Sequence, residues 1–161
     1  DLTLSAFRAI QKRQPRARLV LVGDGPSRAG LQAAHPDVIF AGVQRGEALS
    51  RHYASCDLFL FASLSETFGN VTLEAMASGL ATVAFDYGAA REHLRHAEHG
   101  AVVGLADPDQ FVQASVRTAC AQDLRQMGHA ARCSVQPLHP MKVAQDFAGL
   151  LAGLHWQRKA A

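Results

Sequence analysis

Short apolar runs alternate with helix-compatible stretches along this chain, and that alternation restricts its fold more than any other feature. Each run closes at Gly, Ser or Asp, a pattern typical of strands that are buried on both faces of a parallel sheet. The runs are ARLVLVGDGP, DVIFAG, DLFLFAS, LATVAFDYG and GAVVGL. The stretches between them predict helices over about 26–34, 46–55, 70–78, 88–96 and 107–119. Strands and helices in succession, with short connections, predict an α/β fold with a doubly wound parallel sheet.

Both ends of the chain are predicted to be helical. Near the start, apolar residues share one helix face, and no strand precedes them. These residues are Leu4, Ala6, Phe7, Ala9 and Ile10. Pro137 and Pro140 then interrupt the chain before a closing helix with an apolar stripe. The stripe consists of Val143, Phe147, Leu150 and Leu154. Since no linker or repeat divides the 161 residues, we predict one domain over 1–161.

Composition and charge exclude several classes of protein. The net charge is +2 and the basic residues are scattered, which argues against nucleic acid as the main partner. No apolar run reaches the ~18 residues of a membrane span, and no signal peptide is evident. Cys56, Cys120 and Cys133 fit neither a disulfide framework nor a zinc spacing, so we predict reduced cysteines in a cytoplasmic protein. His93 and His96 share a helix face but lack a third ligand, so no metal site is predicted.

Two glycine loops follow predicted strands, at the edge where open α/β sheets bind ligands. Gly23-Asp24-Gly25-Pro26 is not a dinucleotide fingerprint, because Arg28 stands where a further glycine is needed, and no Walker-type Gly-Lys-Ser/Thr ending exists. A plain strand-to-helix turn, with Pro26 at the first helical position, and a ligand contact are equally supported. Gly42-Val43-Gln44-Arg45-Gly46 offers backbone groups to a base and Arg45 to an anion, although a solvated Arg is the commoner state.

The stretch ETFGNVTLEAMASG, residues 66–79, sets Glu66 and Glu74 on either side of a Phe68-Gly69-Asn70 turn that is free of Lys and Arg. A helix is predicted to follow, with Gly79 as its left-handed C-terminal cap. The first turn of such a helix offers unpaired N–H groups and roughly half a positive charge. Gly69 permits close approach and Asn70 can cap. These features predict a site for a phosphate or diphosphate.

The two carboxylates have more than one interpretation. Each can accept two hydrogen bonds from vicinal hydroxyls, as acids do for the ribose in dinucleotide folds. A diphosphate with a sugar at each end, as in a nucleotide sugar, therefore fits between them. Taken singly, Glu66 can complement the helix start and Glu74 can be a solvated helix residue. A glycosidase pair, with carboxyls roughly 5–9.5 Å apart, is a third interpretation. The amides between the acids argue against it, because a neutral glycoside has no anion to hold.

The segments GDGP, FAGV and YASCDLFLFASLSETFGNVTLEAMASGLATVAFDYGAAREH resemble the C-terminal domain of family 4 GT-B glycosyltransferases. The resemblance covers nearly the whole chain and is most specific at the Glu-x7-Glu motif of Glu66 and Glu74. It implies a Rossmann-like domain, one half of a GT-B enzyme. It also implies retaining transfer from a nucleotide-diphosphate sugar, without a metal or other cofactor. The wording around Asn70 and Phe85-Asp86-Tyr87-Gly88 is most similar to bacterial GDP-mannose-dependent α-mannosyltransferases that act on glycolipids, and a UDP-sugar is the alternative donor.

The resemblance also implies roles for individual residues. Glu66 would contact hydroxyls of the donor sugar as the catalytic residue, and Glu74 would contact the nucleotide ribose. Backbone amides of the turn would hold the diphosphate, and Val43 would lie along the base. The expected donor site comprises Gly23, Asp24, Gly42, Val43, Glu66, Thr67, Phe68, Gly69, Asn70, Val71 and Glu74. A nucleotide-sugar epimerase of related fold and a non-catalytic nucleotide-sugar-binding module are the alternative functions.

The chain departs from the family pattern in its extent. Family members carry the acceptor site in an N-terminal domain, and they place an Arg and a Lys on the donor phosphates just after the first strand of the C-terminal domain. This chain starts beyond that strand, and Lys12, Lys142 and Lys159 match no such position. We therefore expect it to act with its own N-terminal domain on a lipid or saccharide acceptor, in the cytoplasm or peripherally at the inner membrane face. Alone, it is expected to bind GDP or UDP weakly and to transfer nothing.

One loop near the end of the motif region also departs from the family. The usual Gly-Gly pair is Gly88-Ala89 here. The sequence therefore leaves open whether this loop contacts a ligand.

Overall fold

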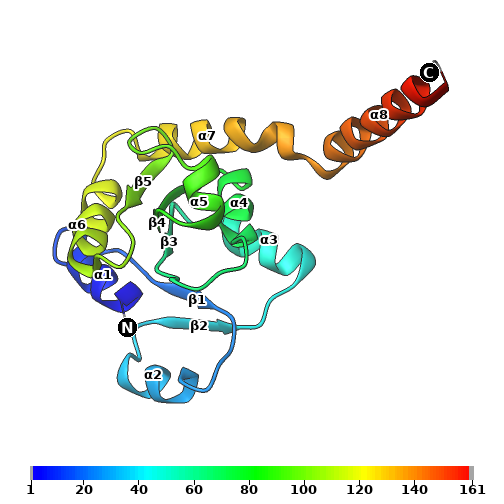
Figure 1. Ribbon diagram of the computed structural model, residues 1–161. Coiled ribbons are helices and arrows are strands. Elements are labelled where there is room, and N and C mark those ends of the chain that lie inside the picture. Colours follow the sequence, from blue (N-terminus) through cyan, green and yellow to red (C-terminus); the bar gives the residue numbers. More distant parts are fainter. Residues whose placement is uncertain (1, 160–161) are drawn as a thin grey trace.

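The computed structural model describes residues 2–159, with side chains of the last helix described as far as Gly153. Helices and strands alternate along the chain as predicted (Figure 1). The elements are α1 (Leu2–Gln11), β1 (Val20–Val22), α2 (Arg28–Ala34), β2 (Ile39–Gly42), α3 (Gly46–Ala54), β3 (Leu58–Phe61), α4 (Asn70–Ala77), β4 (Ala81–Phe85), α5 (Gly88–His93), β5 (Gly100–Val103), α6 (Pro108–Ala119), α7 (Leu124–Val135), the 3₁₀ turn η1 (Gln136–Leu138) and α8 (Pro140–Lys159).

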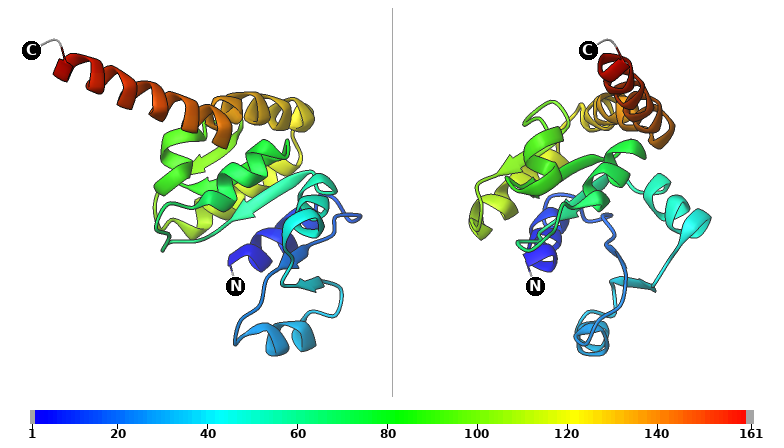
Figure 2. Two further views of the ribbon diagram at one scale, coloured as in Figure 1. Left: turned by 90° about the vertical axis from the view of Figure 1, so that its right-hand side faces the viewer. Right: turned by 45° about the vertical axis from the view of Figure 1, so that its right-hand side comes forward.

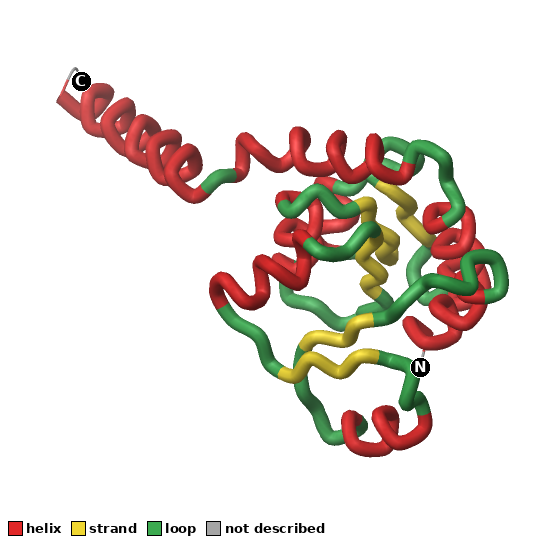
Figure 3. The backbone as a smooth tube through the Cα atoms, turned by 180° about the vertical axis from the view of Figure 1, so that it is seen from behind, coloured by secondary structure: helices red, strands yellow, loops and turns green. Residues whose placement is uncertain are grey.

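All strand pairs are parallel, which confirms the α/β class. The strands form two sheets, one with the order β1-β2 and one with the order β3-β4-β5. Val20 lies opposite Ile39 in the first sheet, and Leu58 lies opposite Ala81 in the second. Figure 3 shows the two groups of strands apart from one another. Among the described residues no strand pairing joins β1 to β3, so the expected single sheet is divided between these two strands.

The three-stranded sheet is covered by helices on both faces, so the expectation of a doubly wound fold is correct. Strand β4 lies at its centre, and all five of its residues are buried. Val83 and Phe85 pack with residues of α1 and α6 on one face, whereas Ala84 packs with residues of α4, α5 and α7 on the other. Opposite faces for alternate residues are the normal geometry of a strand. The carboxyl ends of β3 and β4 therefore emerge between two helical layers.

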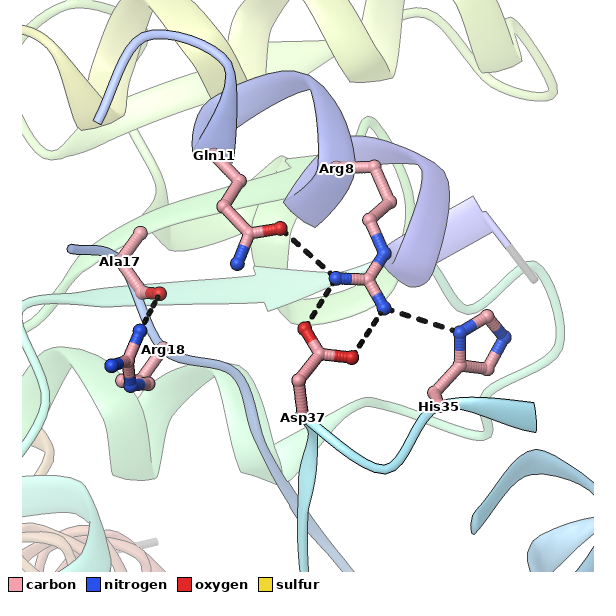
Figure 4. A network of polar contacts seen from close by, with 6 residues as sticks. All are labelled: Arg8, Gln11, Ala17, Arg18, His35 and Asp37. Atoms are coloured by element: carbon pink, nitrogen blue, oxygen red, sulfur yellow. Dashed lines mark hydrogen bonds and ion pairs between the residues drawn. The ribbon is translucent and has the colours of Figure 1, made fainter. Parts of the chain in front are cut away.

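Helix α1 carries the apolar face that its sequence predicts, and it contacts both sheets. Ala6 belongs to the cluster around β4 and β5. Leu4 and Phe7 pack with Val38 and with apolar residues of β1 and β2. The polar side of α1 is tied to the connection between α2 and β2, where the two guanidinium nitrogens of Arg8 donate to the two carboxylate oxygens of Asp37 (Figure 4).

The Arg8–Asp37 pair makes folding stability depend on pH. Hydrogen bonding from Arg8 holds the pKa of Asp37 well below its usual range. The pair therefore stabilises the fold above the ordinary carboxyl pKa of about 4, and that stabilisation disappears as the pH falls toward the lowered value. We expect Asp37→Asn to flatten the fall in unfolding free energy below about pH 4, measured by urea titration at several pH values. Glu47→Gln is the control, because Glu47 pairs with Arg51 inside a single helix. Equal slopes for wild type and Asp37→Asn would contradict this role.

Helix α7 was not predicted, although its sequence is amphipathic. The residues that it buries, Gly128, Ala131 and Val135, recur at helical spacing, but a glycine within the pattern lowers its helix propensity. Gly128 lies so close to the turn after α4 that a Cβ atom there would be 2.1 Å from the carbonyl oxygen of Gly79. The predicted helix end at Gly79 is confirmed, because φ is +82° and the N–H donates to Met76.

The closing helix is present as α8, but its apolar stripe is not part of the core. Val143, Phe147 and Leu150 are 50%, 62% and 68% exposed, and the helix projects away from the remaining fold in Figures 1 and 3 and in the left view of Figure 2. The side chain of Leu154 lies outside the described residues. No helix in the described part of the chain has the length and apolar character needed to cross a membrane.

Candidate functional site

The acidic turn lies between β3 and α4, and Gly69 sets the start of the helix. Gly69 is the N-cap, with φ at +91°, a left-handed conformation that favours glycine. Asn70 is the first helical residue, so the expectation that it caps the helix is wrong, and no side chain of the described residues caps α4. The N–H of Thr72 donates to the carbonyl of Gly69. The amides of Asn70 and Val71 are left in the geometry that binds anions at helix starts.

Glu66 lies beside this helix start. The position that a Cβ atom would occupy on Gly69 is 3.9 Å from the Cβ and Cγ atoms of Glu66. The hydroxyl of Ser63 donates to Oε1 of Glu66 over 3.0 Å. Glu66 is partly buried, so its carboxylate is oriented before any ligand binds. Sequence reasoning missed Ser63, although a hydroxyl three residues before an acid in a loop is a recognisable local pair.

Glu74 lies one helical turn beyond Asn70 and shares its face of α4. Both residues are exposed, whereas Thr72 and Ala75 are buried. The hydroxyl of Tyr53, in α3, donates to Oε2 of Glu74 over 3.2 Å. Burial and the neighbouring carboxylate both raise the pKa of Tyr53, so its hydroxyl stays a donor at neutral pH. Tyr53 was also missed, because 21 residues separate the partners and no local pattern joins them.

A second loop supports the turn from the carboxyl end of β4. The N–H of Ala89 donates to the carbonyl oxygen of Phe68 over 2.7 Å. Gly88 permits this approach, since a Cβ atom there would lie 2.4 Å from the same oxygen, and φ at this residue is +53°. Ala89 is buried. Ala89, at the second position of the usual Gly-Gly pair, therefore fits the fold. Its amide donates a hydrogen bond within the protein.

The two glycine loops meet at the ends of β1 and β2. The N–H of Gly23 donates to the carbonyl of Gly42 over 2.8 Å. Asp24 accepts a hydrogen bond from the Gly25 amide over 2.8 Å, and its carboxylate lies 3.8 Å from Arg28. A hollow of about 260 Å³ lies here. Its lining residues are Leu21, Val22, Gly23, Asp24, Gly25, Pro26, Ser27, Arg28, Leu31 and Phe40.

The predicted start of the next helix is wrong at Pro26. Helix α2 begins at Arg28 with Ser27 as its N-cap, because the chain first makes a turn in which the Arg28 amide donates to the carbonyl of Gly25. Pro26 therefore lies in this turn and not at the first helical position.

The expected site residues thus fall into two groups. Gly23, Asp24 and Gly42 lie together at the β1–β2 edge, next to the exposed Val43. The second group surrounds the start of α4 and consists of Glu66, Thr67, Phe68, Gly69, Asn70, Val71 and Glu74. Within residues 2–159, no hydrogen bond or ion pair joins the two groups. No cluster of three or more potential metal ligands occurs among the same residues.

Comparison with known sequences relates the chain to enzymes of sugar transfer. A family model described as glycosyl transferases group 1 matches residues 1–121. The GDP-mannose-dependent alpha-mannosyltransferase of Mycobacterium tuberculosis is 48% identical over 75 residues, which are 47% of this chain and 20% of that protein. The enzyme of the same name from Mycolicibacterium smegmatis is 38% identical over 118 residues, which are 73% of this chain and 31% of that protein. Sulfoquinovosyl transferase SQD2 of Arabidopsis thaliana is 35% identical over 110 residues, or 67% and 22%.

Solved structures share the fold at lower identity. The pneumococcal O-GlcNAc transferase GtfA, in complex with UDP and GlcNAc, superposes with a TM-score of 0.78 at 22% identity, over 95% of this chain and 32% of that one. Anabaena Alr3699/HepE, in complex with UDP and glucose, gives 0.74 at 22% identity, over 93% and 44%. The chain spans less than half the length of each of these proteins and less than a third of the sequence relatives named above.

Proposed function

Since this chain belongs to the group 1 glycosyl transferases, we propose that it is the donor-binding, C-terminal part of a retaining hexosyltransferase that needs no metal or other cofactor. One observation supports this above all others. The start of α4 is free of side-chain caps, and along the chain an acid oriented by a hydroxyl lies before it and another after it, Glu66 with Ser63 and Glu74 with Tyr53. A diphosphate with a sugar at each end matches this arrangement, because the amides can bind the phosphates and each carboxylate can accept hydrogen bonds from sugar hydroxyls.

We favour GDP-mannose as the donor. Three relatives that are 38–48% identical to this chain carry the name GDP-mannose-dependent alpha-mannosyltransferase, one of them from Corynebacterium glutamicum at 39% over 90 residues. A UDP-sugar is the second possibility, because the structures of GtfA and HepE contain UDP. In either case the base is proposed to lie along Val43, close to the Gly23–Gly42 contact.

The proposed chemistry follows from where charge develops. As the bond between the anomeric carbon and the phosphate breaks, negative charge grows on the leaving diphosphate. Amides at the start of α4 would stabilise that charge more in the transition state than in the ground state. Glu66 would hold hydroxyls of the donor sugar so that the acceptor attacks on the face that the diphosphate leaves. Glu74 would hold the ribose hydroxyls.

The whole enzyme is proposed to contain further parts. Its N-terminal domain would supply the acceptor site for a lipid or saccharide, and the complete protein would act in the cytoplasm or peripherally at the inner membrane face. The isolated chain would then bind nucleotide weakly and transfer no sugar.

Calorimetric titration tests the donor class directly. The complete protein and the 161-residue chain would each be titrated with GDP, UDP and ADP and with the corresponding sugar nucleotides. We expect a nucleoside diphosphate to bind both, and product analysis of the complete protein to show sugar transfer to an acceptor. Epimerised donor as the product, or binding without any turnover, would replace the proposal by one of its alternatives. Failure of all three nucleotides to bind the complete protein would remove it.

Tyr53→Phe tests whether the hydrogen bond from Tyr53 to Glu74 contributes to nucleotide binding. The substitution removes one hydrogen bond of the kind that contributes about 0.5–1.5 kcal/mol, so nucleotide affinity of the complete protein should fall by about two- to tenfold. The ring keeps its edge contact with Phe59, whose centroid is 5.9 Å away, and the thermal unfolding midpoint should stay near that of wild type. An unchanged dissociation constant would show that Tyr53 does not position Glu74 for binding.

A further inference from the structure

The connection between β4 and α5 carries an ion pair that the proposed chemistry does not use. Nε of Arg91 donates to Oδ1 of Asp86 over 3.2 Å, and Nη2 of Arg91 donates to the backbone carbonyl oxygen of Asp86 over 2.8 Å. A guanidinium that donates two bonds from its rigid fork fixes the orientation of its partner better than a single bond does. The side chains of Arg91 and Asp86 are 59% and 45% exposed, so core packing does not explain why they meet.

The backbone of Asp86 is fixed to the sheet. Its N–H donates to the carbonyl of Val103, the last residue of β5, over 2.7 Å. The next N–H, that of Tyr87, donates to the carbonyl of Phe85 over 2.8 Å. Asp86 is therefore a fixed point at the carboxyl end of β4, and Arg91 connects α5 to it.

Helix α5 needs such a connection because it is short. It has six residues, its N-cap residue Tyr87 makes no side-chain cap, and it buries only the small side chains of Ala89 and Ala90. A helix of this length is not stable without tertiary contacts. Among the described residues, the two bonds from Arg91 are the only hydrogen bonds that side chains of α5 make. They therefore fix the start of α5 relative to β4.

The start of α5 contacts the acidic turn of the candidate site, and α5 lies beside α4 (Figure 1). The amide of Ala89 donates to the carbonyl of Phe68. The ring of Phe68 also meets the ring of His93 edge-on, with 6.2 Å between the centroids. Phe68 directly precedes Gly69, the N-cap of α4. Contacts therefore run from the end of β4, through the ion pair and α5, to the residue before this N-cap.

We propose that Arg91 is a positioning residue of the candidate diphosphate site. By holding Asp86 it sets the position of the first turn of α5. Through the amide of Ala89, that turn sets the position of the Phe68 carbonyl and of the amides that open α4. In this role Arg91 touches neither the phosphates nor the sugars. The inference rests on the proposed function, because it assumes that the start of α4 binds a diphosphate.

Hydrogen exchange in the complete protein tests the structural step without any ligand. Met in place of Arg91 keeps a long unbranched side chain but has no donor. In Arg91→Met the amide of Ala89 should exchange about three- to tenfold faster than in wild type, relative to the amide of Ile39 in the other sheet. A factor of this size corresponds to the modest stabilisation that an exposed ion pair and its hydrogen bonds supply. Arg95→Met is the matched control, because it removes the same charge just beyond α5, where Arg95 pairs with Glu98. It should leave the exchange of Ala89 unchanged.

Nucleotide titration of the complete protein tests the functional step. Arg91→Met should weaken the binding of GDP by about three- to tenfold, and that of GMP by less than twofold, because GMP has fewer phosphate oxygens to place on the amides of α4. UDP and UMP replace these probes if wild type binds uridine nucleotides instead. Asp86→Asn should also weaken GDP binding. The double variant should then bind GDP about as well as Arg91→Met alone, since residues that act as one unit are not additive.

Three results would overturn the proposal. The first is an unchanged exchange rate of Ala89 in Arg91→Met. The second is an equal loss of GDP and GMP affinity, which would indicate a general structural role. The third is unchanged or tighter GDP binding in Asp86→Asn, because a guanidinium that acts on the phosphates directly would be freed by losing its partner. Absence of nucleotide binding in wild type would instead remove the proposed function and this inference with it. A wild type that binds and an Arg91→Met variant that binds equally well would remove this inference alone.

Discussion

Replacing Glu66 or Glu74 with Ala is expected to lower sugar transfer by the complete protein by about 10- to 100-fold for each substitution. Each substitution removes a charged acceptor, and a hydrogen bond to a charged group contributes about 1.5–3 kcal/mol. The two effects should differ in kind. Glu66→Ala should act mainly on kcat, because that carboxylate is proposed to orient the reacting sugar, whereas Glu74→Ala should act mainly on KM through the ribose. Initial rates over a range of donor concentrations measure both quantities.

Suitable controls for these variants are exposed acids on other elements. Glu47 lies in α3 and Glu98 in the connection before β5, and both make surface ion pairs with nearby arginines. Their replacement by Ala should leave kcat and KM within about twofold of wild type, as is usual for surface sites. Wild-type turnover in both Glu66→Ala and Glu74→Ala would remove the assignment of the site. Ser63→Ala keeps Glu66 but removes its hydrogen-bond donor. The rate of sugar transfer in this variant should lie between those of wild type and Glu66→Ala.

A single methyl group at Gly128 is expected to destabilise the fold strongly. The added Cβ atom would lie 2.1 Å from the carbonyl oxygen of Gly79 and 3.3 Å from the amide nitrogen of Ala81. Both are backbone atoms, so α7 must move as a unit and lose contacts with α4. Overpacking of this kind costs about 1–3 kcal/mol or more, which lowers the unfolding midpoint by about 2–4 °C per kcal/mol for a chain of this size. Thermal unfolding followed by circular dichroism measures the change.

The chain offers a matched control for this substitution. Gly30 also lies inside a helix, α2, but apart from its chain neighbours and the backbone of its own helix no atom lies within 4 Å of its added Cβ position. Gly30→Ala should therefore stabilise the protein by about 0.5–1 kcal/mol, because Ala has the better helix propensity. Opposite signs for the two Gly→Ala changes would identify the close contact as the cause. A midpoint for Gly128→Ala equal to or above that of wild type would contradict the packing described for α7.

The sequence predicted those parts of the fold that depend on local patterns. The alternation of apolar runs predicted the parallel strands, and the spacing of Glu66 and Glu74 around Gly69 predicted where the acids lie relative to a helix start. The likeness to group 1 glycosyl transferases was also read from those residues. Partners that are distant along the chain could not be predicted, and Tyr53 is the clearest example because its contact with Glu74 depends on how α3 packs against α4.

Other errors have separate physical causes. Helix α7 was not predicted although its buried residues recur at helical spacing, because Gly128 lowers helix propensity in the middle of that pattern. The stripe of Val143, Phe147 and Leu150 predicted α8 correctly as a helix, but periodicity does not say whether an apolar face is covered by the same domain. Asn70 was expected to cap α4, yet Gly69 holds the N-cap position because a left-handed φ is needed there. The division of the sheet depends on tertiary pairing that no local pattern reports.

The hydrogen bond from the Ala89 amide to the Phe68 carbonyl also bears on how the site responds to temperature and ligand. It fixes the acidic turn to the start of α5 in the free protein. The conformational entropy of that turn is therefore lost when the chain folds and not each time a ligand binds. Capture of a diphosphate would then proceed with little rearrangement of the backbone around Gly69. Weakening this hydrogen bond would leave every group proposed to touch the ligand unchanged. The acidic turn would then lose its fixed conformation, and each ligand would have to order it on binding.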